Sequence, residues 1–130
     1  REECITLASV EPRHAVATVA QRPGTRHPVT VGAPGKAILS QLPVSAWPKG
    51  APVPDASRLA AEVREAAVRG WAESQDEVIT SLHSVAVPLA LRSHAPASIA
   101  VVYLPAGRDA ASIAERLTRA ASLVRGALGG

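Results

Sequence analysis

The chain has 130 residues, 47% of them hydrophobic and 19% charged, a composition typical of one folded domain and not of a disordered segment. The net charge is +3, but the arginines are scattered, which argues against direct nucleic-acid binding. A single cysteine, Cys4, excludes an internal disulfide and a cysteine cluster for zinc. Because no apolar run approaches the roughly 20 residues of a membrane helix, we expect a cytoplasmic protein without a membrane partner.

The N-terminal third predicts two strands and a short helix. Apolar residues alternate with polar ones over residues 4–10 and again over 14–20, which predicts a β-hairpin. After a polar, turn-rich stretch, residues 29–31 are expected to be extended. Residues 37–42 are expected to form a short helix that ends before Pro43.

The middle of the chain predicts a surface loop followed by an amphipathic helix. Residues 43–54 are rich in proline and are expected to form the loop. The helix runs from about Ala56 to Arg69, with Asp55 as its N-cap and Gly70 in the left-handed conformation at its end. Its apolar face is expected to contain Leu59, Val63, Ala66 and Ala67.

The C-terminal part predicts a hairpin and a final helix. The strands are expected over residues 81–91 and 97–104, joined by a polar turn. Asp109 is expected to cap a helix whose apolar residues recur at helical spacing, namely Ile113, Leu117, Ala120, Val124 and Leu128. The order of elements predicts an α+β domain with a largely antiparallel sheet and its helices on one side.

Alternation within the last two strands assigns their side chains to two faces of the sheet. One face is expected to combine Ser84 and Ala86 with Val101 and Tyr103, a half-polar set that is typical of a ligand cavity. The other face is expected to pack against helices through small aliphatic side chains, namely Val85, Val87, Ala100 and Val102.

Four features follow one another in a familiar order: Gly-Lys-Ala-Ile-Leu at 35–39, Gly70-Trp71 with an acidic stretch to Glu77, Ser-Val-Ala-Val-Pro at 84–88, and the closing helix. Together they resemble the C-terminal effector-binding domain of the IclR family of transcription regulators, over nearly the whole chain. The resemblance implies a GAF-like domain, a curved antiparallel sheet with helices on one face and a ligand pocket on the other. The 130 residues would be this single domain. Since the chain contains no methionine, we expect an upstream part to be missing, and the resemblance implies that this part is a winged helix-turn-helix domain.

The resemblance also implies a binding site for a small effector, typically a carboxylate. The loop that closes over the ligand corresponds to Ala33, Pro34 and Gly35, where a helix N-terminus offers N–H groups to an anion. Pro34 lacks an N–H, and Gly35 could equally serve only close packing. On the strand side the implied lining residues are Ser74, Ser84, Val101 and Tyr103.

Several positions depart from the family pattern. Thr30 stands at the usual position of a loop histidine, and Ser74 replaces an acidic residue. Val101 and Tyr103 replace two serines, so the expected pocket is less polar and partly filled. Tyr103 is either a ligand contact, with Ser84 as a possible hydroxyl partner, or a plain core residue, and Lys36 either attracts an anion or is a solvated surface residue.

Two functions remain open from the sequence. The first is an effector sensor that modulates DNA binding through rearrangement of a homodimer or homotetramer; the second is a dimerisation module with a vestigial pocket. An enzyme is not expected, because Cys4 and His14 lack an acidic partner and the chain has no nucleophile elbow or phosphate loop. No cofactor or metal is expected either, since the four histidines show no paired ligand spacing.

Overall fold

The computed structural model describes residues 3–10, 23–49, 56–76, 81–92 and 95–129. Its centre is a three-stranded antiparallel sheet in the order β3 (Ala72–Gln75), β4 (His83–Leu89) and β5 (Ala97–Tyr103). A smaller antiparallel ladder joins β1 (Glu3–Ile5) to β2 (Arg26–Pro28). The α+β class and the antiparallel sheet are confirmed.

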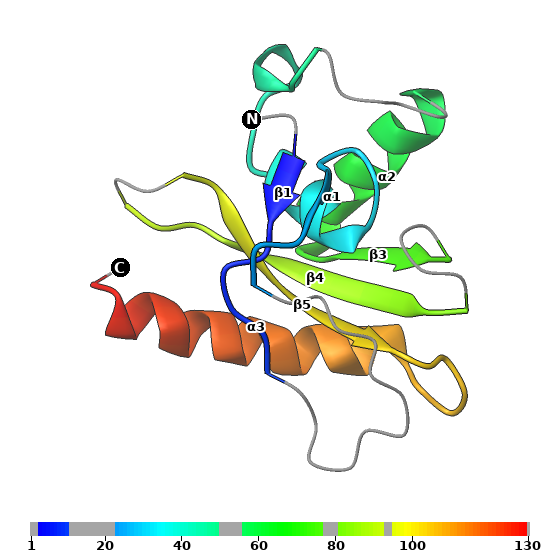
Figure 1. Cartoon of the computed structure of the whole chain (residues 1–130), viewed down its shortest axis with the longest axis vertical. Helices are drawn as coiled ribbons and strands as arrows, with labels where there is room; N and C mark the ends of the chain where they lie inside the picture. The colour runs from blue at the N-terminus through cyan, green and yellow to red at the C-terminus, as the bar shows by residue number, and fades with distance from the viewer. Residues whose placement is uncertain (1–2, 11–22, 50–55, 77–80, 93–94, 130) are drawn as a thin grey trace.

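Helices cover both faces of the central sheet (Figure 1). The long α3 (Ala110–Ala127) packs against β4 and β5 on one face. On the other face lie α1 (Ala33–Leu39) and α2 (Ala56–Arg69), together with the β1–β2 ladder. The order of elements had suggested helices on one side of the sheet only, and this prediction is wrong.

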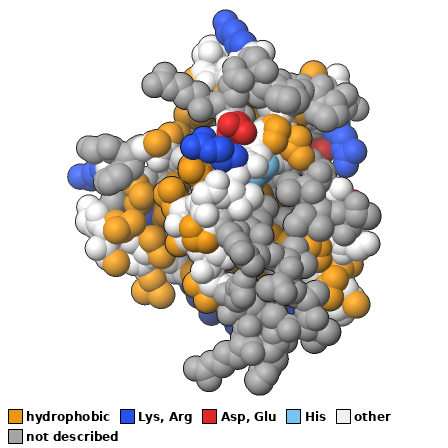
Figure 2. Space-filling model, viewed as in Figure 1, with side chains coloured by type: hydrophobic (Ala, Val, Ile, Leu, Met, Phe, Trp, Pro, Cys, Tyr) orange, Lys and Arg blue, Asp and Glu red, His pale blue; other side chains and the backbone are white. Residues whose placement is uncertain are grey.

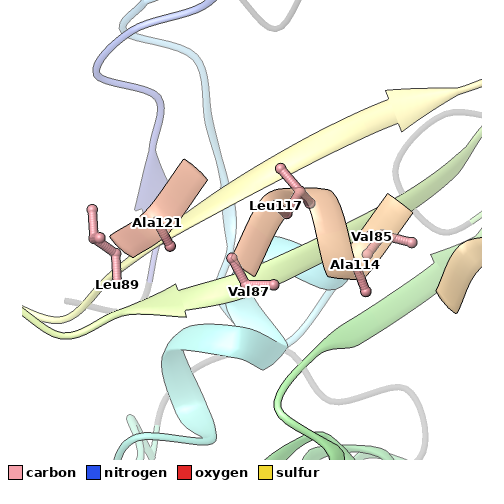
Figure 3. Close-up of a cluster of buried hydrophobic side chains, with 6 residues drawn as sticks. All are labelled: Val85, Val87, Leu89, Ala114, Leu117 and Ala121. Carbon is pink, nitrogen blue, oxygen red and sulfur yellow. The ribbon is translucent and has the colours of Figure 1, made fainter. Parts of the chain in front are cut away.

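The α3 face holds the largest aliphatic cluster among the described residues. Figure 3 shows Val85, Val87 and Leu89 of β4 facing the helix residues Ala114, Leu117 and Ala121. Burying each valine or leucine side chain contributes about 1.5–3 kcal/mol, so this layer is a main source of stability. Leu123 and Leu128 point away from it and are exposed, and in Figure 2 hydrophobic atoms gather where Figure 1 places the C-terminal end of α3.

Both long helices are confirmed, with the C-terminal end of α2 and the N-cap of α3 where they were predicted. Helix α2 has the expected bounds, and Gly70 follows it with a φ of 93°. Asp109 caps α3 by accepting hydrogen bonds from the Ser112 backbone N–H and hydroxyl. The predicted cap Asp55 lies outside the described residues, as do residues 50–54 of the proline-rich loop. In the described part of that loop Val44–Ala46 form a 3₁₀ turn, η1.

The predicted faces of the last hairpin are wrong. In the observed register Ser84 lies opposite Val102, Val85 opposite Val101, and His83 opposite Tyr103. Directly opposite residues point to the same face, so Val101 and Tyr103 share the α3 face with Val85 and Val87. A shift of one residue moves every side chain to the other face, and the turn, which alternation does not reveal, sets this register.

The N-terminal region differs most from its prediction. The first strand ends at Ile5, and its partner is Arg26–Pro28, which lies in the stretch expected to be a turn. The predicted strand at 14–20 lies outside the described residues. Residues 29–31 belong to a turn in which the Val31 N–H donates to the Pro28 carbonyl.

The bounds of one helix and the existence of one strand also differ from the prediction. Helix α1 begins at Ala33 and not at residue 37, with Pro34 in its first turn, and it ends at Leu39. The short edge strand β3 had not been predicted, because its sequence Ala-Glu-Ser-Gln has little β propensity. Its strand conformation comes from pairing with β4.

Candidate functional site

Helix α1 approaches the central sheet closely because the residues between them are small. A cluster of five alanines, each at most 1% exposed, fills the space between α1, α2 and the strands β3 and β4: Ala33, Ala37, Ala66, Ala72 and Ala86. Larger side chains would hold the helix farther from the strands. The start of α1 therefore lies directly over polar residues of the sheet that share a face with Ala72 and Ala86, two positions along each strand.

Gly35 fixes α1 against the turn that precedes it. A Cβ at this position would lie 1.9 Å from the Val29 carbonyl oxygen, a distance that no side chain tolerates. Of its two possible roles, close packing is thus established by the geometry, and the packing is against the backbone of the turn. This contact holds the N-terminus of α1 in one position.

Two serines lie under the start of α1. Ser74 and Ser84 are directly opposite each other in the β3–β4 ladder, and both are buried. The Ser74 Oγ accepts a hydrogen bond of 3.1 Å from the Ala33 N–H. The Ser84 Oγ is buried without a hydrogen-bond partner in the described part of the chain. A buried hydroxyl without a partner is costly, so Ser84 is the least satisfied polar group on this face.

A third serine, Ser98, was not identified from the sequence. Its hydroxyl donates to the Pro34 carbonyl at 3.0 Å and so ties β5 to the first turn of α1. Ser98 lies opposite Pro88 and therefore on the same face as Ser84. Alternation from Ser84 would have included it if the register of the hairpin had been known.

Val101 and Tyr103 do not join this group. Tyr103 packs beside the α3 cluster, and its ring makes an edge contact with His83 at 6.0 Å between ring centroids. Burial raises the pKa of Tyr103, and the negative charges of Glu73 and Asp109 add to the effect. The hydroxyl pairing expected between Tyr103 and Ser84 is absent, because the two residues lie on opposite faces of the sheet.

Lys36 is neither solvated nor open to an anion. It is only 2% exposed, and its ammonium group donates to Glu62 of α2 at 2.6 Å. Glu62 also accepts from Arg58 at 2.7 Å. Burial opposes ionisation of Glu62, but the hydrogen bonds and charges of Lys36 and Arg58 outweigh it and lower the pKa of the carboxyl. The Lys36 charge is therefore matched within the fold.

A cleft of about 240 Å³ lies beside this ion pair, between α1, α2 and β3. Its charged residues are three bases and three acids: Lys36, Arg58, Arg69, Glu62, Glu65 and Glu73. They pair with one another, since Glu62 bridges two of the bases and Arg69 contacts the other two acids. Ser74 also lines the cleft, which adjoins the serine group at that point.

The described ranges contain neither a cluster of metal ligands nor a membrane-spanning helix. No three side chains among histidine, cysteine, aspartate and glutamate come together there as a metal site. No helix in those ranges combines the length and apolar character needed to cross a membrane.

The sequence matches no protein-family model and no curated protein. The fold, however, is similar to that of solved transcription regulators. The match to the Thermotoga maritima IclR has a TM-score of 0.80 at 18% identity and spans 99% of this chain and 58% of that one. The match to the Agrobacterium tumefaciens repressor BlcR has a TM-score of 0.78 at 21% identity, spanning 98% and 56%.

A further match identifies the part of those regulators to which the fold corresponds. The C-terminal domain of the E. coli transcriptional regulator KdgR matches with a TM-score of 0.67 at 16% identity, over 83% of this chain and 75% of that one. The chain thus has the fold of the C-terminal domain of IclR-type regulators and spans little more than half of the longer ones. These neighbours are transcription regulators and not enzymes.

Proposed function

We propose that this chain is the effector-sensing C-terminal domain of an IclR-type transcription regulator. The fold match over almost the entire chain supports this assignment. The regulator would act in the cytoplasm, contact DNA through a winged helix-turn-helix domain upstream, and assemble as a homodimer or homotetramer. The effector would be bound and released without chemical change.

In this proposal the effector binds where α1 begins, and the contacting residues are Ala33, Pro34, Gly35, Ser74 and Ser84. The single observation that carries the choice is the buried Ser84 hydroxyl, which lacks a partner in the described part of the chain. A ligand oxygen placed there would satisfy it and recover the cost of its burial. The proposal leaves out Val101 and Tyr103, because they line the α3 face.

Binding would be linked to regulation through α1. Only a ligand that binds two arrangements of the protein with different affinity can shift the balance between them. A ligand entering above Ser84 would separate the alanines of α1 from Ala72 and Ala86 on the sheet, and α2 would move with α1 because Glu62 holds the Lys36 ammonium group. The motion of α1 and α2 would then alter the assembly of subunits and the spacing of their DNA-binding domains.

The test is thermal melting of the purified chain with a panel of small aliphatic and aromatic carboxylates. A ligand at one hundred times its Kd stabilises the folded state by about 2.7 kcal/mol, which is easily detected. We expect one class of acid to raise the Tm, and Ser84→Ala to abolish the rise while Ser122→Ala, on the exposed side of α3, retains it. An equal rise in both variants would reject the site, and no rise with any acid would reject carboxylate sensing.

One observation favours a second candidate, a dimerisation module that binds no ligand. The alanine cluster is packed so closely that α1 leaves little room over the sheet. Such a module would show a concentration-dependent Tm and no response to any acid. The response to the acids therefore separates the two candidates, and melting at two protein concentrations tests the self-association that the second candidate requires.

A further inference from the structure

The β1–β2 ladder places the only cysteine of the chain directly opposite a histidine. Cys4 and His27 are partners in the antiparallel register, and they are 7% and 9% exposed. Opposite residues in such a ladder share one face, with Cβ atoms about 4.5–5.5 Å apart. The thiol and the imidazole therefore lie side by side in the interior, on a different element from the α1 site.

Nothing in the described part of the chain satisfies the imidazole of His27. Both ring nitrogens are buried and make no hydrogen bond there. Burial lowers the pKa of His27, and the opposing charge of Glu3 does not restore it. The ring is thus neutral at physiological pH and keeps one nitrogen lone pair free to coordinate.

The surroundings of this pair are apolar. Cys4 packs in a cluster with Val29, Leu39, Leu59 and Val63, and Ile38 and Trp47 lie against that cluster. Burial raises the pKa of the Cys4 thiol to about 11, so the sulfur carries a proton unless a cation replaces it. Hard cations such as Mg²⁺ and Ca²⁺ need several oxygen ligands and retain water, and this environment offers them neither.

We propose that Cys4 and His27 form a two-coordinate site for a soft monovalent metal ion of the Cu(I) type. Thiolate and neutral imidazole are ligands that such an ion prefers, and a filled-shell monovalent ion accepts two donors in a line. Zn²⁺ needs a larger set of donors, and the described residues supply no third histidine, cysteine or carboxylate.

Binding exchanges one cation for another. The S–H bond of Cys4 breaks, its proton leaves to the solvent, and the sulfur and one His27 nitrogen bond to the metal ion. The metal keeps its oxidation state, so no oxidant or reductant takes part. A bound metal ion would link β1 to β2 next to the turn against which Gly35 of α1 packs. The site does not depend on effector binding.

The test uses Ag(I) as a probe that does not change its oxidation state. Purified chain is titrated with Ag(I) in competition with a chromophoric chelator, and three substitutions are compared with the wild type. We expect one ion per chain, loss of binding in Cys4→Ser, and at least a tenfold weaker affinity in His27→Leu. His83→Leu, which removes a histidine from β4, should bind as the wild type does.

A matched variant separates coordination from packing. His27→Met places a thioether, which is a soft ligand, in nearly the volume of leucine, so it should retain most of the Ag(I) affinity that His27→Leu loses. Melting curves without metal show whether both variants fold, and Ag(I) should raise the Tm of His27→Met more than that of His27→Leu. An affinity of His27→Leu equal to that of the wild type would show that the thiol binds alone, and a wild type that binds no Ag(I) would equally overturn the proposal.

Discussion

The two faces of strand β4 carry different kinds of side chain. Val85, Val87 and Leu89 point toward α3 and form a layer of large aliphatic groups (Figure 3). Ser84 and Ala86 point toward α1, where the alanine cluster and Ser74 lie. The α3 face buries larger aliphatic side chains, whereas the α1 face buries alanines and a hydroxyl group without a partner in the described part of the chain.

This difference separates stability from binding within one strand. A face that serves only packing gains most from large side chains, since each buried methylene contributes about 0.8 kcal/mol. On such a face, small residues and an unsatisfied hydroxyl lower the stability of the fold. The same residues are useful where a ligand or a moving helix must come close to the strand. Substitutions on the two faces should therefore have effects of different kinds.

The largest effect is expected on the α3 face. Leu117→Ala removes a buried side chain between α3 and the sheet and should lower the free energy of unfolding by about 3 kcal/mol. Denaturant unfolding followed by circular dichroism measures it. Leu123→Ala is the control, since Leu123 is 76% exposed on the same helix, and it should change the stability by less than about 0.5 kcal/mol. Equal losses in both variants would contradict the assignment of the core.

A smaller effect is expected where α1 meets the turn. Gly35→Ala forces a methyl group against the Val29 carbonyl and should cost about 2 kcal/mol through the displacement that relieves the overlap. Gly126→Ala on α3 meets no atom within 4 Å and should stabilise the chain by up to about 1 kcal/mol through helix propensity. The same unfolding measurement compares the two, and a neutral Gly35→Ala would mean that α1 does not contact the turn.

The smallest effect distinguishes the two opposite serines. Ser74→Ala removes the acceptor of the Ala33 N–H and should cost about 1 kcal/mol. Ser84→Ala removes a hydroxyl without a partner in the described part of the chain, so the ligand-free stability should stay equal or rise slightly. Thermal melting of both variants in parallel measures the difference. A clear loss in Ser84→Ala alone would show that its hydroxyl has a structural partner.

These faces could be predicted only in part from the sequence. The helices at 56–69 and 110–127 and the two long strands follow from periodicity and caps, which are local signals. The relative register of β4 and β5 depends on the turn between them, and the error of one residue placed Val101 and Tyr103 beside Ser84.

The remaining differences have the same origin in long-range contacts. Residues 26–28 look like a turn in isolation but form a strand because β1 lies beside them. Lys36 looks like a surface residue, and only the fold reveals that Glu62 on α2 neutralises it in the interior. The alanines of the α1 face are individually unremarkable residues, and their clustering arises from four separate elements.

The most direct test of the account follows backbone amide resonances by NMR while the most stabilising acid of the panel is added to the chain. The account predicts shifts concentrated at Ala33, Gly35, Ser74 and Ser84, with those of α1 and α2 changing together. Shifts concentrated at Leu117, Val101 and Tyr103 would place the ligand on the α3 face and contradict the separation of stability from binding.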